Sequence, residues 1–318
     1  DGDAVGSSLA WAEVLRTMGH AVTCVVPNKY PYFLDWMPGI DEVVIFKTDT
    51  EGRARRAIAE ADMIFCLDFN AVSRLEILSD TIAANTTARR VLIDHHLSPD
   101  EGFDLMFSHP DSSSTCFLVY SIVEAMCGAG AITRRMAESL YVGMMTDTGN
   151  FAFSFLTPEL FRAVAVLVEK GISIPDIHNS VYNAYTEGRA RLFGYAINRK
   201  MEVIQDGTVA YMSLLENEMR RFQFQQGDSE GFVNYPLTIK KMKMSAMFLG
   251  HHKFIRVSLR SRGDVDVNLF ARKYFDGGGH KNAAGGKSYV SMDETIAHYI
   301  RSVEEFACEG GLDTPPLR

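Results

Sequence analysis

Long uninterrupted apolar runs are absent from the sequence, and its first residues show no charged-then-apolar signal segment. We therefore expect neither a membrane-spanning helix nor a membrane partner. Cysteine is scarce: the five cysteines are odd in number, lie scattered through apolar stretches and form no CxxC pair. This usage is typical of buried thiols in a reducing compartment, and we predict a cytoplasmic protein.

Positive charge is also in deficit, with 32 Lys and Arg against 40 Asp and Glu and a net charge of -8. A protein that coats long nucleic acid needs a broad basic face, so the composition argues against long duplex as a partner. A small anionic substrate remains compatible, because bound metals can focus positive potential in a cleft. The length of 318 residues favours two domains, and 47% hydrophobic residues are typical of an ordinary globular chain.

The first part of the chain alternates helical and strand patterns. Apolar positions from Val5 to Met18 fall on one helical face, and Gly19 follows as a stop. Four short apolar runs predict buried parallel strands: Ala21 to Val26, Val43 to Phe46, Met63 to Leu67 and Arg90 to Ile93. Three further helices are predicted: Thr115 to Ala125, Thr133 to Met145 and Pro158 to Lys170. The fold class is α/β, beginning with a doubly wound parallel-sheet domain over residues 1–186.

The pattern changes after a helical connector predicted over residues 187–200. Strands are predicted at Gly207 to Leu214, Lys240 to Phe248 and Phe254 to Leu259. We therefore expect a second, smaller mixed α/β domain over residues 201–318, with a sheet that is mainly antiparallel.

Acidic residues and histidines gather where predicted strands and helices end. Met63 to Leu67 runs into Asp68, and the next strand runs into Asp94-His95-His96. Asp147 follows a helix, and Asp1 and Asp3 stand at the start of another. Ligands of a parallel sheet bind beyond the carboxyl ends of its strands. Each residue alone is more typical of a turn or helix cap, but the set together favours a functional site.

The set favours divalent metals. Four carboxylates in one crevice repel each other unless cations lie between them, and two divalent ions would offset Asp1, Asp3, Asp68 and Asp147. Carboxylate and imidazole ligands without thiolates suit Mn²⁺ or Mg²⁺ better than structural zinc, although other divalent ions are compatible. Such a pair of ions, roughly 3.5 to 4 Å apart, activates water for hydrolysis of phosphate esters.

The same residues resemble a known family, the DHH phosphoesterases. Four motifs match in order and spacing: Asp1-Gly2-Asp3-Ala4, Leu67-Asp68, Asp94-His95-His96 and Thr146-Asp147-Thr148-Gly149. Near the C-terminus, Gly277-Gly278-Gly279-His280 with Ala283-Ala284-Gly285 resembles the DHHA1 domain of that family. The resemblance covers essentially the whole chain.

The resemblance implies a role for each site residue. Asp1 would bind the first metal and Asp3 the second, while Asp68 would bridge both. His95 and Asp147 would complete the second site. The catalytic pair would be His96, at the scissile phosphate or the water, and Asp94, which would orient the histidines. The family's first motif begins with a histidine four residues before its first aspartate, so we expect that ligand to lie upstream of Asp1.

The second domain is predicted to read the substrate. The glycines before His280 allow backbone N–H groups, including those of Gly278 and Gly279, to approach an anion. Arg260 and Ser261 match the family's Arg-Ser pair, and Arg260 is predicted to clamp a phosphate. The basic concentration at Lys240, Lys241, Lys243 and His251 to Lys253 is interpreted mainly as the solvated face and turn of a hairpin. We expect the active site in a cleft between the domains.

The compact length resembles the branch of nanoRNases and pAp phosphatases, where pAp is 3',5'-bisphosphorylated adenosine. The implied partners are short RNA oligonucleotides or small phosphorylated nucleotides, and a homodimer is compatible. Hydrolysis of cyclic di-AMP or pApA, an exopolyphosphatase, and a non-catalytic nucleotide- or RNA-binding module stay open as alternatives. The filled positions Asp3, Asp68, His95 and Asp147 argue against the non-catalytic module.

Overall fold

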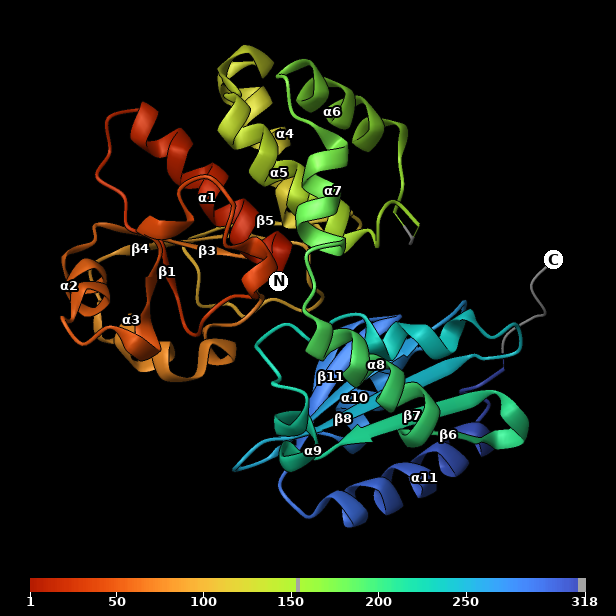
Figure 1. The fold of residues 1–318 in the computed structure, drawn as a ribbon. Helices are drawn as coiled ribbons and strands as arrows, with labels where there is room; N and C mark the ends of the chain where they lie inside the picture. Colours follow the sequence, from red (N-terminus) through yellow and green to blue (C-terminus); the bar gives the residue numbers. More distant parts are fainter. Residues whose placement is uncertain (153–154, 314–318) are drawn as a thin grey trace. The chain divides into compact units, whose positions relative to one another are not determined.

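The chain folds into two compact units, Asp1–Ala184 and Tyr185–Arg318 (Figure 1). Their structure is that of a computed structural model, which describes residues 1–152 and 155–313. Within these ranges, no helix combines the length and apolar character needed to cross a bilayer.

The strands of the first unit are all parallel. They are β1 (Val25–Val26), β2 (Val44–Ile45), β3 (Met63–Leu67), β4 (Arg89–Asp94) and β5 (Leu105–Ser108). β1 pairs with β2 in one sheet, and β3, β4 and β5 form a second sheet in that order. The parallel α/β character predicted from the sequence is confirmed. The strand predicted from Ala21 is shorter than expected, and β5 was not predicted, because Leu105 and Met106 are exposed rather than part of a buried run.

The described residues of this unit also form seven α-helices: α1 (Gly2–Thr17), α2 (Arg53–Glu60), α3 (Ser79–Ala84), α4 (Thr115–Cys127), α5 (Arg134–Asp147), α6 (Pro158–Glu169) and α7 (Ile174–Tyr182). Hydroxyl caps begin four of them, because a side-chain oxygen accepts from the backbone N–H three residues on at Ser114, Thr133, Thr157 and Ser173. α1 packs against α4 and α5, as Figure 1 shows. Short 3₁₀ turns occur at Tyr32–Leu34, Ile40–Glu42, Phe46–Thr48, Val72–Leu78 and Ala129–Ala131.

The second unit is built on a six-stranded sheet. Its strands are β6 (Met201–Ile204), β7 (Val209–Leu214), β8 (Met244–Gly250), β9 (Ile255–Ser261), β10 (Gly278–His280) and β11 (Ala283–Ser288). The spatial order is β10-β11-β9-β8-β7-β6, and β7 with β8 is the parallel pair in an otherwise antiparallel sheet. The mixed, mainly antiparallel sheet predicted from the sequence is confirmed. β8 begins after the lysine cluster rather than within it.

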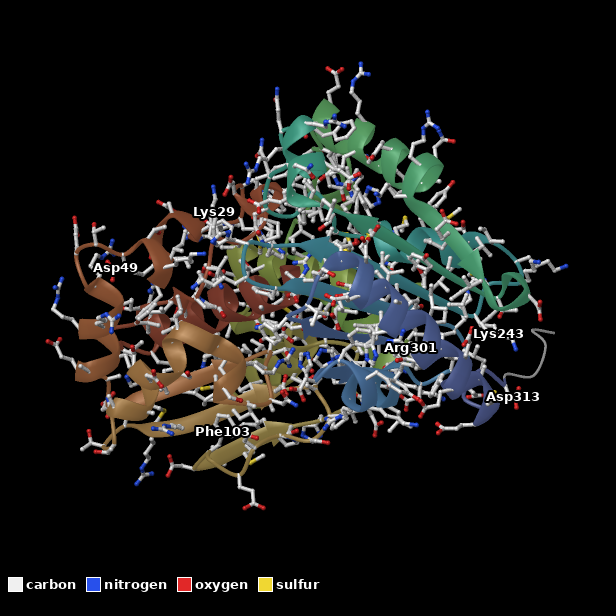
Figure 2. The ribbon with its side chains drawn as sticks, turned by 90° about the horizontal axis from the view of Figure 1, so that it is seen from below. Lys29, Asp49, Phe103, Lys243, Arg301 and Asp313 are labelled. Atoms are coloured by element: carbon white, nitrogen blue, oxygen red, sulfur yellow. The ribbon has the colours of Figure 1, made fainter. Side chains whose placement is uncertain are left out.

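Helices cover both faces of this sheet. They are α8 (Glu187–Lys200), α9 (Glu216–Arg221), α10 (Val267–Tyr274) and α11 (Met292–Cys308), with 3₁₀ turns at Gln205–Gly207 and Phe232–Thr238. One face packs on α10 and α11 through side chains such as Phe270 and Tyr299. The other packs on α8 and α9 through side chains such as Leu192 and Met219. α11 is amphipathic, since Tyr299 is buried while Arg301 is exposed (Figure 2).

Candidate metal and active site

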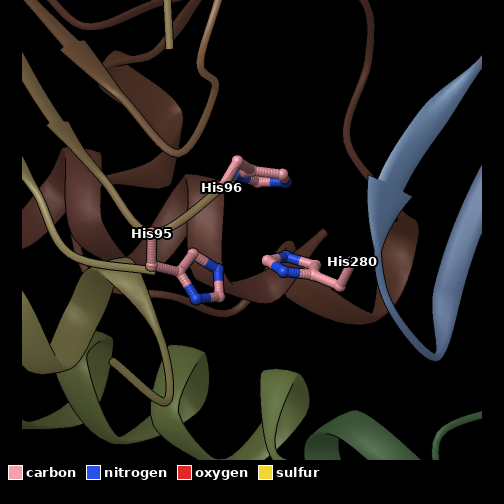
Figure 3. Close-up of side chains that lie close together, drawn as sticks. All are labelled: His95, His96 and His280. Atoms are coloured by element: carbon pink, nitrogen blue, oxygen red, sulfur yellow. The ribbon is translucent and has the colours of Figure 1, made fainter. Parts of the chain in front are cut away.

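The two histidines of the Asp94-His95-His96 triplet directly follow the last residue of β4. The strand itself is buried through Leu92 and Ile93, and Asp94, its last residue, is fully buried. His95 is also buried, and its ring lies edge-on to that of His96 with 5.2 Å between ring centroids (Figure 3). The buried strand therefore presents both imidazoles at one edge of the sheet.

Asp68 reaches the same edge from the neighbouring strand. Leu67 at the end of β3 pairs with Ile93 of β4, and the Asp68 backbone N–H donates to Ile93 O at 3.1 Å. Asp68 has a φ of 64°, a left-handed backbone that costs about 1 kcal/mol or more for a side chain other than glycine. The strained backbone therefore belongs to a residue of the site, because the Asp68 carboxylate lies beside both histidines.

Asp3 is held by a helix N-terminus. It is 1% exposed, and its two carboxylate oxygens accept from the backbone N–H groups of Thr115 at 2.7 Å and Cys116 at 2.8 Å, at the start of α4. The helix dipole favours a negative charge in this position. Asp1 is exposed instead and caps α1 by accepting from the Ala4 N–H at 2.9 Å.

The His95 ring turns one nitrogen toward the carboxylates. Its Nδ1 lies 3.1 Å from the carbonyl oxygen of Ser112, which can only accept, so Nδ1 carries a hydrogen. Its Nε2 lies 3.3 Å from Asp147 Oδ2, 3.6 Å from Asp68 Oδ1 and 3.8 Å from Asp3 Oδ2. In the neutral ring Nε2 bears a lone pair, and a lone pair facing three carboxylates suits a cation among them.

His96 is oriented by Asp94. The His96 Nδ1 lies 2.7 Å from Asp94 Oδ1, and its backbone N–H donates to Asp94 Oδ2 at 3.1 Å. Both oxygens of the buried Asp94 carboxylate thus contact His96, while the carbonyl of Ser112 orients His95. Asp94 was predicted to orient both histidines, and these contacts join it to His96.

Two groups of donor atoms in this unit could hold a metal ion: Asp3 with His95 and Asp147, and Asp68 with Asp94 and His96. The donor atoms of each group lie within 4.8 Å of one another. Burial raises the pKa of the Asp68 carboxyl well above its usual value, and the nearby carboxylates of Asp3, Asp147 and Asp94 raise that pKa further. The residues fit a cation, because a positive charge relieves both effects.

Cys116 supports the site as a neutral thiol. Burial first, and then the Asp3 carboxylate, raise the pKa of Cys116 well above its usual value. Its Sγ lies 3.6 Å from the backbone oxygen of Asp3, to which the thiol donates. A protonated thiol is a poor metal ligand, so the donor set consists of carboxylate oxygens and imidazole nitrogens.

Ser112, Thr115 and Cys116 were not predicted as site residues. Besides its backbone contact with Asp3, the Thr115 hydroxyl donates to Asp68 Oδ1 at 3.0 Å. The sequence carried one signal for this segment, since Ser112-Ser113-Ser114-Thr115 precedes an apolar helical run and is typical of a helix start.

Protons would compete with a bound cation at this site, which predicts how stability depends on pH. An Asp68 carboxyl with a raised pKa in the folded state keeps its proton to higher pH than in the unfolded chain, where its pKa is about 3.9. Without metal, this group therefore lowers the free energy of unfolding as pH rises above about 4.

We expect saturating Mn²⁺ to raise the unfolding temperature by about 5 to 10 °C at neutral pH, and by less at mildly acidic pH. Thermal shift assays with Mn²⁺ and with EDTA measure this, and an unchanged temperature at neutral pH would contradict it.

The second unit aligns two of its predicted substrate contacts. Ala283 of β11 pairs with Arg260 of β9 on one side and with His280 of β10 on the other. Residues directly opposite each other in antiparallel strands point to the same face, so Arg260 and His280 share a face, with backbones about 10 Å apart. The small Ala283 side chain lies between them.

The glycines before His280 form the edge strand β10. Gly279 has a φ of 151°, and a Cβ there would lie 2.5 Å from the Ala283 backbone oxygen, so the close pairing with β11 requires glycine. The Gly279 N–H donates to Asn268 Oδ1 at 3.0 Å, and Gly278 is partly buried. Ser261 is buried, and its hydroxyl donates to Val265 O at 2.6 Å. Ser261 thus holds the loop that follows Arg260.

Comparisons with known proteins match both units. Residues 1–144 match the DHH family, N-terminal domain, and residues 206–307 match the DHHA1 domain. A crystal structure of an exopolyphosphatase-related protein from Bacteroides fragilis is 41% identical, with a TM-score of 0.88 over 96% of this chain and 89% of that one. Two bifunctional oligoribonuclease and PAP phosphatase NrnA proteins are each 25% identical. The one from Thermus thermophilus aligns over 98% of this chain and 88% of its own length, and the one from Bacillus subtilis over 92% and 88%. The chain therefore belongs to the DHH family, with a DHHA1 domain, and is a phosphoester hydrolase.

Proposed function

We propose that the chain hydrolyses short oligoribonucleotides and pAp with water activated by two divalent metal ions, most favourably Mn²⁺. One observation carries the proposal: the His95 Nε2 lies within 3.8 Å of carboxylate oxygens of Asp3, Asp68 and Asp147. The names of the two NrnA relatives, which align over nearly the whole chain, support the substrate class.

Different residues of the chain would hold each of the two ions. Asp3, His95 and Asp147 would hold one ion, Asp1 would contribute to the other, and Asp68 would bridge both. Bound there, the ions would acidify a water and polarise the phosphoryl oxygens. The Thr115 hydroxyl, 3.0 Å from Asp68, would keep the bridging carboxylate in place.

His96 is the proposed contact to the scissile phosphate or the attacking water. Because its Nδ1 lies 2.7 Å from a carboxylate oxygen of Asp94, the proton on Nδ1 is fixed, and Nε2 is the nitrogen that would exchange a proton with substrate. The buried negative charge of Asp94 would stabilise the imidazolium when His96 is protonated.

The second unit would bind the substrate phosphates through Arg260, His280 and the backbone of Gly278 and Gly279. Arg260 and His280 lie on one face of the sheet, opposite the same small residue of β11. A guanidinium can bind a phosphate through two parallel hydrogen bonds. The boundaries of the two domains and the cleft between them stay predictions.

Replacing Arg260 with alanine is expected to raise KM for pAp by about 10- to 100-fold and to change kcat little, because a charge-assisted hydrogen bond contributes about 1.5 to 3 kcal/mol. Arg260→Lys should recover part of the loss, since lysine keeps the charge but not the fork of donors. Steady-state kinetics measures both. Arg301→Ala, at an exposed position of α11, is the matched control. Equal KM values for Arg260→Ala and Arg301→Ala would remove Arg260 from the site.

The function itself is tested by Mn²⁺-dependent turnover of pAp, a dinucleotide, pApA, cyclic di-AMP, polyphosphate and a long RNA. We expect pAp and the dinucleotide to be cleaved fastest. The exopolyphosphatase-related name of the Bacteroides fragilis protein makes polyphosphate the second candidate substrate. Rapid cleavage of polyphosphate alone would overturn the nucleotide proposal, and binding of nucleotides without any turnover would favour a non-catalytic module.

A further inference from the structure

A pocket in the DHHA1 unit lies at the turn between β8 and β9. The pocket has a volume of about 310 Å³, and the turn forms one of its walls, together with the start of α9 and the segment that leads into α11. Its lining includes Glu216, His251, Lys253, Phe254 and Tyr289. Arg260, the proposed phosphate contact, lies at the opposite end of β9 from this turn.

The pocket is lined by aromatic rings. The rings of His251 and Phe254 are stacked, with 5.1 Å between centroids and 25° between planes. Tyr289 lies beside them, with its ring centroid 6.5 Å from that of Phe254. The Tyr289 side chain is 73% exposed, more than any other large hydrophobic residue in the described ranges. Aromatic faces held in this way can stack on a further planar ring.

Two lysines lie near the aromatic rings, and the Glu294 carboxylate accepts from Ser291 at the pocket's edge. Lys253 is exposed at the turn, and Lys287 Nζ lies 5.1 Å from the centroid of the Phe254 ring. The carboxylate that lines the pocket, that of Glu216, is bound by Arg220 at 2.7 Å. The local charge therefore favours an anionic ligand, although the whole chain is acidic.

We propose that this pocket binds a nucleobase of single-stranded RNA, with the adjoining phosphates near Lys253 and Lys287. The assignment to RNA rests on the proposed function, because oligoribonucleotides are the proposed substrates. Stacked aromatic rings beside basic side chains bind single strands without regard to sequence, since every base has a π-face. The sequence-based interpretation of His251 to Lys253 as a solvated hairpin turn is thereby extended to a ligand contact.

The spacing predicts a length dependence. Phe254 directly precedes β9 and lies six residues before Arg260, or about 20 Å at the rise of a strand. That distance corresponds to about six nucleotides at a stacked spacing of about 3.4 Å, and to fewer in an extended strand. An octanucleotide can occupy both places, whereas pAp and a dinucleotide cannot.

The test is the binding of end-labelled oligoribonucleotides to the 318-residue chain in EDTA, measured by fluorescence anisotropy. We expect Tyr289→Ala to raise the Kd of an octanucleotide by about 5- to 50-fold, the loss of one stacked base, and to leave the Kd of a dinucleotide unchanged. Phe254→Ala should act in the same direction. Tyr235→Ala is the matched control, because Tyr235 is also exposed (43%) but does not line the pocket.

An unchanged octanucleotide Kd in Tyr289→Ala would overturn the proposal. So would an equal loss of affinity for the octanucleotide and the dinucleotide. An equal loss of affinity for AMP and the octanucleotide would also overturn it, because the pocket would then bind free nucleotides. The kcat/KM for pAp should be unaltered in Tyr289→Ala. Because binding is measured without metal, a failure of RNA hydrolysis would contradict the proposed function and leave this result intact. Normal hydrolysis with an unchanged octanucleotide Kd would remove the pocket alone.

Discussion

Replacing Asp68 with asparagine is expected to lower pAp hydrolysis by at least about 10³-fold, because a catalytic metal contributes several kcal/mol to the transition state. Asparagine keeps the shape of the side chain and an oxygen that can accept from the Thr115 hydroxyl, 3.0 Å away in the native chain. It removes the charge that would bridge the ions. The loss should therefore appear in kcat and in Mn²⁺ binding rather than in folding.

The same substitution should stabilise the metal-free protein. The Asp68 carboxyl is buried beside Asp3, Asp147 and Asp94, and burial and these charges raise its pKa. A neutral amide escapes both costs, so we expect the unfolding temperature in EDTA to rise by at least about 2 °C. With Mn²⁺ present, the wild type should be the more stable of the two proteins.

Asp41→Asn is the matched control, since Asp41 is exposed in a 3₁₀ turn of the same unit. It should change neither turnover nor the response of the unfolding temperature to Mn²⁺. Wild-type turnover in Asp68→Asn would remove the bridging carboxylate from the mechanism, and an unfolding temperature in EDTA below that of wild type would contradict the proposed repulsion.

The second large effect is expected from Gly143→Ala on α5. A Cβ at this position would lie 2.6 Å from Asp3 Oδ1 and would overlap Cys116 Sγ. The backbone N–H groups of α4 hold the Asp3 carboxylate, and the Cys116 side chain is fully buried. Neither neighbour can therefore move freely. We expect a loss of about 1 to 3 kcal/mol in the free energy of unfolding, from overpacking, together with a large loss of turnover as Asp3 is displaced.

Gly194→Ala is expected to change the free energy of unfolding in the opposite direction to Gly143→Ala. Gly194 is an exposed position inside α8, and a Cβ there would meet no heavy atom within 4 Å. Alanine should therefore raise the free energy of unfolding by about 0.5 to 1 kcal/mol and leave turnover unchanged. Chemical denaturation and pAp kinetics of both variants measure the contrast. Native stability and activity in Gly143→Ala would contradict the proposed packing role.

The parts of the site that follow from local pattern were predictable. Asp68 and Asp94 end apolar strand runs, and the carboxyl ends of neighbouring parallel strands meet at one edge of a sheet. The contact between Asp3 and the start of α4 was not predictable, since it joins residues 112 positions apart through backbone groups that leave no mark in the sequence. The contact of the Ser112 carbonyl with His95 was not predictable for the same reason, because it is also made by a backbone group.

The fold shows the same limits. Periodicity predicts α1, α4, α5, α6 and α8 and the mixed character of the second sheet. Helices α2, α3, α7, α9, α10 and α11 were not predicted from the sequence. Strand β5 was also missed, because the exposed Leu105 and Met106 break the buried pattern. In the second unit, the alignment of Arg260 and His280 depends on the register of both strands with Ala283. A pairing register is a tertiary property, and a motif of glycines and a histidine does not specify it.

The carboxylates and histidines at the ends of β3 and β4 are proposed to hold the metal that supports hydrolysis of phosphate esters. The most direct measurement is pAp hydrolysis by metal-stripped protein titrated with Mn²⁺, with bound Mn²⁺ determined on the same samples. We predict no turnover without metal, and turnover that rises in step with bound Mn²⁺. Hydrolysis at the full rate in EDTA would contradict the account.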